Sequence, residues 1–85
     1  MTNVLLSADG PVSVYAVPDP VAKNLDKLCL EFSMESGGIF DETDFIWYLN
    51  REKPWGESVF VENLGWIRDR SEIPPQYRDC KWYNF

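Results

Sequence analysis

Alternating apolar and polar positions mark two short stretches at the start of the chain. Residues 3–7, NVLLS, precede Asp9-Gly10, and residues 11–17, PVSVYAV, follow with a period of two. Because an Asp-Gly pair accepts positive φ, it favours a tight turn between antiparallel strands. Pro11 fits the first position of a strand, where no ladder hydrogen bond is required of it. This pattern predicts an N-terminal β-hairpin.

The apolar positions then change to a helical period. Asp19 is suited to cap a helix, and Pro20 fits the first helical position, where its missing N–H would have no partner. Ser36-Gly37-Gly38 supplies an end signal. We therefore expect one helix between these signals. Its apolar stripe consists of Val21, Leu25, Leu28, Cys29 and Phe32.

A second helix is predicted to begin at Asp41. With Asp41 as the cap, Asp44 occupies the third helical position, where a carboxylate favours the positive end of the helix dipole. Phe40 and Phe45 then have the spacing of a hydrophobic staple, which fixes the direction of entry into the helix. Farther along, residues 58–62, SVFVE, are typical of a third strand.

The chain ends in an aromatic-rich segment, residues 74–85. Pro74-Pro75 favours an extended path, and a sheet of three short strands needs its edge or its open face covered. We expect this tail to cover the core, and a hook for a partner is the alternative interpretation. Its aromatic side chains are Tyr77, Trp82, Tyr83 and Phe85.

These elements together predict a single α+β domain over residues 1–85. We expect a small three-stranded antiparallel sheet, formed by the N-terminal hairpin and the later strand and packed by two helices. The predicted order is β-β-α-α-β, followed by an extended aromatic C-terminal tail.

Charge adds a second constraint. Residues 1–49 hold eight acidic and two basic side chains, which accounts for the whole net charge of −6. Direct binding to nucleic acid is disfavoured because it needs a basic surface, whereas a basic partner would be attracted. No apolar run approaches the ~18 residues of a membrane helix, and the N-terminus lacks the features of a signal peptide. We expect a cytoplasmic protein.

The residues of common catalytic sites are missing. The chain has no histidine, which excludes Ser-His-Asp and Cys-His arrangements. Gly37-Gly38 follow a helix instead of opening one, so no phosphate-binding loop is predicted. Cys29 and Cys80 are interpreted as buried thiols rather than as a disulfide or a zinc site. The acids after residue 40 lack the spacing of a calcium loop. We expect no enzymatic activity, no cofactor and no metal.

Acidic residues around the connection between the two helices are the candidate partner-binding site. If the connection is compact, they form a patch or stripe that can imitate nucleic-acid phosphates in a basic groove. An exposed tryptophan beside acids is typical of protein-binding surfaces. The alternatives are a solvated acidic surface and a tryptophan that covers the rim of the core. The candidates are Asp26, Glu31, Glu35, Asp41, Glu42, Asp44 and Trp55.

Four segments carry a resemblance. They are YAVPD (15–19), DFIWYLN (44–50), VENLGW (61–66) and the ending PPQYRDCKWYNF (74–85). On these segments, under half of the chain, the sequence resembles a group of short bacterial proteins with a P-x-x-Y-x-D-C-x-x-Y-N-F ending. The resemblance implies a bacterial or mobile-element setting and no particular activity.

The leading functional hypothesis is a non-enzymatic domain that docks on a basic, nucleic-acid-handling protein. Phage-type inhibitors of defence enzymes and immunity proteins that block toxins are such domains. The alternative is a structural module that acts as a homodimer, through the edge of the third strand or through exposed tryptophans.

Overall fold

The N-terminal hairpin is present as predicted. The computed structural model describes residues 1–36 and 41–85. Strand β1 (Thr2–Ser7) pairs antiparallel with β2 (Val12–Val17). Asp9 has a φ of 55° in the turn between them, which is the left-handed conformation that an Asp-Gly pair tolerates.

The first predicted helix is two helices, which corrects the sequence prediction. Helix α1 (Asp19–Lys23) and helix α2 (Leu25–Ser36) are separated at Asn24, where φ is −114° and ψ is 28°. The Asn24 side-chain amide donates to the Pro20 carbonyl oxygen at 3.0 Å, alongside its own backbone N–H at 3.2 Å. An asparagine side chain that bonds to local backbone competes with helix continuation.

The start of α1 also differs from the prediction. Pro18, and not Asp19, precedes the first helical residue, and no side chain caps this end. Asp19 instead accepts a hydrogen bond from the Thr2 hydroxyl at 2.7 Å. Gly37-Gly38 and Phe40, which were predicted to end this helix region and to staple the next, lie outside the described residues.

Helix α3 (Glu42–Glu52) begins as predicted, with Asp41 as its cap. The Asp41 carboxylate accepts from the Asp44 N–H at 3.1 Å, and the Asp44 carboxylate accepts from the Asp41 N–H at 3.0 Å. This reciprocal pair is a capping box, and it satisfies two N–H groups that the helix itself leaves unpaired.

The predicted three-stranded antiparallel sheet with two helices is wrong. The sheet has four strands in the order β3-β2-β1-β4, with β3 at Val59–Gly65 and β4 at Trp82–Asn84, and β4 runs parallel to β1. Three helices pack on it. The aromatic tail is therefore part of the sheet instead of an extended cover. Two short 3-10 helices, η1 (Arg70–Glu72) and η2 (Pro75–Tyr77), lead into β4.

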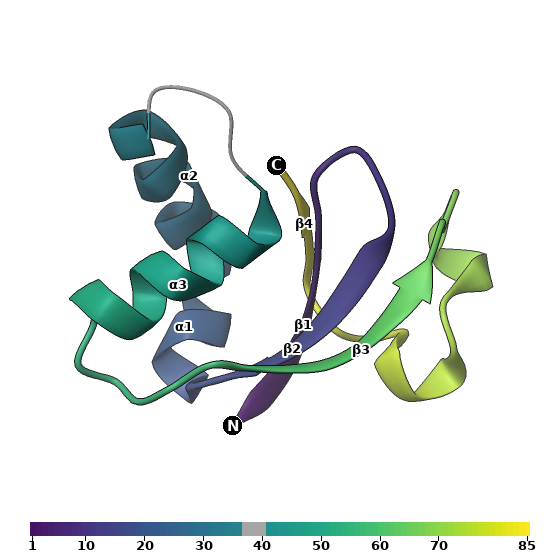
Figure 1. Ribbon diagram of the computed structural model, residues 1–85. Coiled ribbons are helices and arrows are strands. Elements are labelled where there is room, and N and C mark those ends of the chain that lie inside the picture. The colour runs from purple at the N-terminus through teal and green to yellow at the C-terminus, as the bar shows by residue number, and fades with distance from the viewer. Residues whose placement is uncertain (37–40) are drawn as a thin grey trace.

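Both faces of the sheet are covered, by different layers. Figure 1 shows the three α-helices on one side of the sheet and the 3-10 segment on the other. Alternate residues of β1 pack against the two layers. Val4 and Leu6 face the helices, while Leu5 packs with Ile73 and Tyr77 on the side of the 3-10 segment. The continuous apolar run in β1 follows from this double burial.

The C-terminal aromatics belong to the core, as the preferred interpretation of the tail predicted. Tyr77 is buried, and the half-buried Trp82 packs on the same side of the sheet. Tyr83 and Phe85 pack against the helical side. The ring of Phe85 lies 5.2 Å from that of Phe45, between centroids.

Candidate functional site

Strand β3 exposes a run of apolar side chains at one edge of the sheet. The ladder joins it to β2, and within residues 1–36 and 41–85 no strand pairs with its other side. Val59, Phe60 and Val61 are consecutive, and their side chains are 47%, 56% and 41% exposed. Three adjacent exposed apolar residues on an edge strand are unusual in a domain that acts alone.

Helix α3 extends this surface. Thr43, Trp47 and Asn50 are spaced by four and three residues, so they lie along one side of the helix. The Asn50 side chain holds the start of β3, donating to the Ser58 carbonyl oxygen at 3.1 Å and accepting from the Ser58 N–H at 2.8 Å. Trp47, one turn earlier, is 65% exposed.

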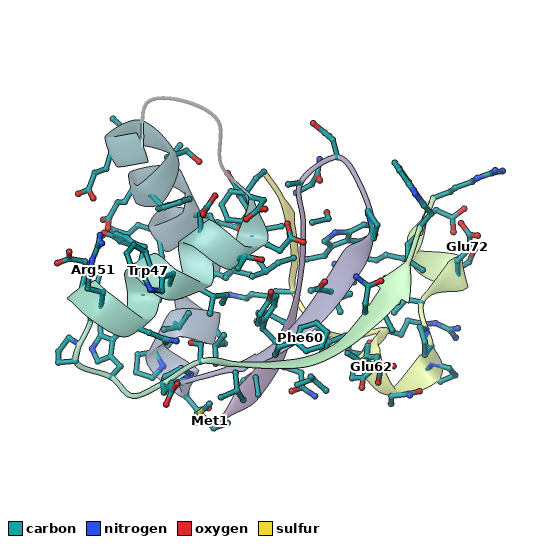
Figure 2. All side chains as sticks on the ribbon, viewed as in Figure 1. Met1, Trp47, Arg51, Phe60, Glu62 and Glu72 are labelled. Atoms are coloured by element: carbon teal, nitrogen blue, oxygen red, sulfur yellow. The ribbon has the colours of Figure 1, made fainter. Side chains whose placement is uncertain are left out.

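The other end of this helical row is also tied to β3. Thr43 interacts with the hydroxyl of Tyr15, whose pKa is raised mainly by burial. The Tyr15 ring meets the edge of the Phe60 ring at 5.6 Å between centroids. Trp47 therefore lies on α3 between two contacts that link this helix to the region of β3, and Figure 2 shows Trp47 beside Arg51, and Phe60 on β3. We call the group Trp47, Val59, Phe60 and Val61 the edge surface. Phe60 pairs with Tyr15 and Val59 with Ala16, so these two side chains emerge on opposite faces of the edge strand.

The backbone of β3 is a poor template for another strand. Phe60 pairs with Tyr15 and Glu62 with Val14, so Val61 is an extra residue in the ladder. A second irregularity leaves Leu64 without an opposite residue. Bulges interrupt the two-residue repeat of outward-facing N–H and C=O groups and discourage edge-to-edge pairing. Recognition at this edge would therefore depend on side chains.

Charge changes sign along the edge surface. At the start of α3, the negative charges of Glu42 and Asp41 are close enough to Tyr15 to add to the rise of its pKa. At the other end, the Arg51 guanidinium stacks on the Trp47 ring, with 4.6 Å from Cζ to the ring centroid. An apolar centre with charged ends is the usual anatomy of a protein-binding surface.

The predicted acidic residues divide into separate groups. Glu31 and Glu35 lie on α2 near Tyr48: burial raises the pKa of this tyrosine, and the negative charges of Glu35 and Glu31 raise it further. Glu52 contributes to the same rise and forms an ion pair with Arg51 at 3.0 Å.

The remaining acids lie elsewhere. Asp26 is about 140° around α2 from Glu31, and its charge acts on Tyr83 of β4, whose pKa is raised first by burial. Asp41 and Asp44 form the cap of α3, with Glu42 beside them. The structure therefore brings together Glu31 with Glu35, and Asp41 with Glu42 and Asp44, while Asp26 stands apart.

Trp55 follows α3 and is 41% exposed. The Lys53 ammonium lies 5.8 Å from the centroid of its ring and 5.9 Å from that of Tyr48. Trp55 is thus associated with a cation at the end of α3, away from the acids of the helix start. Trp47 and Phe60 were not among the predicted site residues: Trp47 is exposed on α3, and Phe60 is exposed on the edge strand β3.

Neither cysteine has the environment of a reactive thiol. Burial raises the pKa of Cys29 to about 12, and the charge of Asp26 adds to this. Cys80 is partly buried, and burial raises its pKa as well. Within residues 1–36 and 41–85, no three Asp, Glu or Cys side chains lie close enough together to hold a metal ion.

The structure defines a small α+β domain with an exposed apolar edge. None of its described helices is long and apolar enough to cross a membrane. No family model matches the chain, and neither curated proteins nor solved structures show a significant match to it.

Proposed function

We propose that this protein is a non-enzymatic interaction domain that binds a basic partner protein through the edge surface. The observation that carries the proposal is the exposed apolar run Val59–Val61 on an edge strand, with a further exposed aromatic side chain, Trp47, on α3. Aromatic side chains at the centre of a patch are the residues that most often dominate binding energy.

The acidic groups supply the preference for a basic partner. Asp41, Glu42 and Asp44 lie at the end of α3 that borders Tyr15 and Phe60, and the whole chain carries a charge of −6. Complementary charges at the rim of an interface raise the association rate and reject wrong partners. A nucleic-acid-handling enzyme with a basic groove is the class of partner that fits, with this domain as its inhibitor.

Matched variants test the proposal by affinity capture from bacterial lysate. Trp47→Ala and Phe60→Ser remove the apolar centre, while Trp66→Ala removes an indole that is 71% exposed outside the edge surface. A partner that is captured by wild type and by Trp66→Ala, and lost with the other two variants, would support the edge surface. Equal capture by all four proteins would contradict it.

Charge variants test the basic partner separately. Glu42→Gln and Asp26→Asn each remove one negative charge, but only Glu42 borders the edge surface. We expect Glu42→Gln to slow association and Asp26→Asn to leave it nearly unchanged. The wild-type association rate should also fall as salt rises, because exposed charges are screened over about 8–10 Å at 0.1–0.15 M. A rate that is indifferent to salt would contradict a basic partner.

A second copy of the chain is the alternative occupant of the edge surface. Helix α3 is acidic at Asp41 and Glu42 and carries the Arg51 guanidinium near its other end, where Glu52 also pairs with it; a twofold axis near Trp47 would bring Arg51 of one copy toward the acids of the other. Light scattering at micromolar concentration decides between the two. A monomeric mass favours a different partner, whereas a dimer that Phe60→Ser converts to monomer favours the homodimer.

A further inference from the structure

A cleft of about 700 Å³ lies at the opposite edge of the sheet from β3, where β1 extends beyond β4. The first half of β1, helix α1 and the residues that lead into β4 form its walls. It is independent of the edge surface, which is built from α3 and β3. The lining residues are Thr2, Asn3, Val4, Asp19, Ala22, Lys23, Asp79, Cys80 and Lys81.

The cleft contains an unpaired part of the sheet. Leu5 N–H donates to the Lys81 carbonyl oxygen at 2.8 Å, and the Ser7 carbonyl oxygen accepts from Phe85 N–H at 2.8 Å. Since alternate residues of a strand direct their backbone groups to the same side, Asn3 also faces the β4 side. The β1–β4 ladder begins only at Leu5, so within the described residues the N–H and C=O of Asn3 have no strand partner.

Two lysines provide positive charge at this place. The Lys81 ammonium reaches across to α1 and donates to the Lys23 carbonyl oxygen at 3.1 Å. Lys23 and Lys81 are both exposed and line the cleft from opposite walls. Asp19 is already held by the Thr2 hydroxyl, which leaves Asp79 as the one lining acid for which the described residues show no hydrogen bond.

The walls between these polar groups are apolar. Ala22 lines one wall with 7% of its surface exposed, and Val4 lies beneath the surface as a fully buried core residue, so the apolar contact available here is small. An extended chain that lies along them can pair with the backbone of Asn3 and continue the sheet, as peptides do when they add to an exposed strand. Its terminal carboxylate would then find ammonium groups within the same cleft.

We infer that this cleft binds the C-terminal segment of a peptide, with one backbone unit paired to Asn3 and the carboxylate held by Lys23 and Lys81. The ligand is an extended apolar segment with a free carboxylate. The site does not depend on the proposed edge surface, because no lining residue belongs to α3 or β3.

Backbone-amide NMR titration with two tripeptides tests this inference. Acetyl-Val-Leu-Val carries a free carboxylate, and its C-terminal amide is the matched control. We expect the carboxylate peptide to shift the amide signals of Asn3 and Lys81 and to bind about fivefold to tenfold more tightly than the amide, since a charge-assisted hydrogen bond is replaced by a neutral one. Equal affinities, or no shift at Asn3, would overturn the inference.

Lysine variants locate the carboxylate. Lys23→Gln and Lys81→Gln should each weaken binding of the carboxylate peptide by about threefold to tenfold. Lys27→Gln makes the same charge change at an exposed position on α2, outside the cleft, and should not alter it. If all three variants lose the same affinity for the carboxylate peptide, the effect comes from the change in net charge, and the proposed site is contradicted.

Acetate separates a bare anion site from a peptide site. If acetate matches the peptide in affinity and in the shifts at Asn3, the backbone pairing is refuted. Peptide-induced shifts around Trp47 and Phe60 would assign the peptide to the edge surface and also refute the cleft. The capture experiments with Trp47→Ala and Phe60→Ser test the edge surface only, so their outcome does not affect the conclusion about the cleft.

Discussion

The two outer strands of the sheet differ in how they use their apolar side chains: those at β4 pack into the core, and those on β3 are exposed. At β4, Tyr83 and Phe85, the residue after the strand, pack against the helical layer with 5.1 Å between their ring centroids, and Trp82 packs against the other layer. On β3, Phe60 packs against the Tyr15 ring and is 56% exposed. Aromatic side chains at one edge therefore complete the fold, and those at the other edge remain available for contact.

The larger difference lies in how each edge is anchored. The Asn84 side chain of β4 accepts from the Ser7 hydroxyl and from Asp9 N–H, both at 2.8 Å, and donates to the Asp9 carboxylate at 2.9 Å. These contacts tie the C-terminal strand to the hairpin turn. The bulges of β3 loosen the opposite edge instead. The contacts that secure the fold are thus concentrated at the β4 edge, and the exposed apolar side chains lie at the opposite edge.

Deletion of residues 82–85 should produce the largest effect. It removes β4 and three aromatic side chains from the two core layers, in a domain whose total stability is expected to be about 5–15 kcal/mol. We expect no cooperative thermal transition by circular dichroism at 25 °C and above. A truncated protein with an unchanged melting temperature would mean that β4 contributes little, and the comparison of the edges would fail.

The pair Phe85→Ala and Phe60→Ala compares the edges with the same substitution. Loss of the Phe85 ring leaves a void beside Phe45, and we expect a cost of about 2–3 kcal/mol, below the value for a fully buried phenylalanine. Phe60→Ala should cost about 0.5 kcal/mol, as for surface positions. Urea unfolding of both variants gives the two values. Similar losses would show that Phe60 is part of the core.

Asn84→Ala should cost about 1–2 kcal/mol, because it leaves the Ser7 hydroxyl and Asp9 N–H without their acceptor. The control is Asn63→Ala on β3, whose side chain accepts from the exposed Gly65 N–H at 2.7 Å and donates to the hydroxyl of the buried Ser13 over a longer distance, 3.3 Å. We expect its cost to be smaller, about 0.5 kcal/mol. The same urea experiment measures both, and the reverse order would contradict the anchoring of β4.

The pH dependence of stability should show the smallest effect. The folded state raises the pKa of Cys29 from about 9 to about 12, so between these values the unfolded state binds fewer protons. Stability is then fully present below pH 9 and is lost as pH rises toward 12. Urea midpoints at pH 8 and pH 10 should fall less in Cys29→Ala than in wild type. An equal fall would assign the alkaline loss to tyrosines, whose raised pKa values act in the same direction.

Local signals in the sequence predicted several elements correctly. Asp9-Gly10 marked the hairpin turn, and Asp41 with Asp44 marked the start of α3, since turn and cap chemistry depend on a few adjacent residues. Asn24 indicated the break between α1 and α2, but the continuous apolar stripe favoured a single helix, and the prediction followed the stripe. The asparagine side chain competes for a helical carbonyl, and a regular spacing of apolar residues does not register such a contact.

Long-range contacts decided the rest. Trp82–Asn84 is too short to show a period, and its partner, β1, lies at the other end of the chain. A parallel pairing between such distant segments has no local signature, because it depends on where the intervening layers place the chain. Likewise, the letters VFV at 59–61 are those of a buried strand. The sequence suggested that this strand has a free edge, but the exposure of all three apolar side chains emerges only from the tertiary structure.

The sequence by itself determined the class of fold, the hairpin, the cap of α3 and the uneven distribution of charge. Each of these depends on composition or on neighbouring residues. The tertiary structure alone decided which aromatics are buried, how the acids divide among separate groups, and that Asn3, Lys23 and Lys81 line one cleft. Those properties depend on which distant segments pack together, and packing is a property of the whole chain.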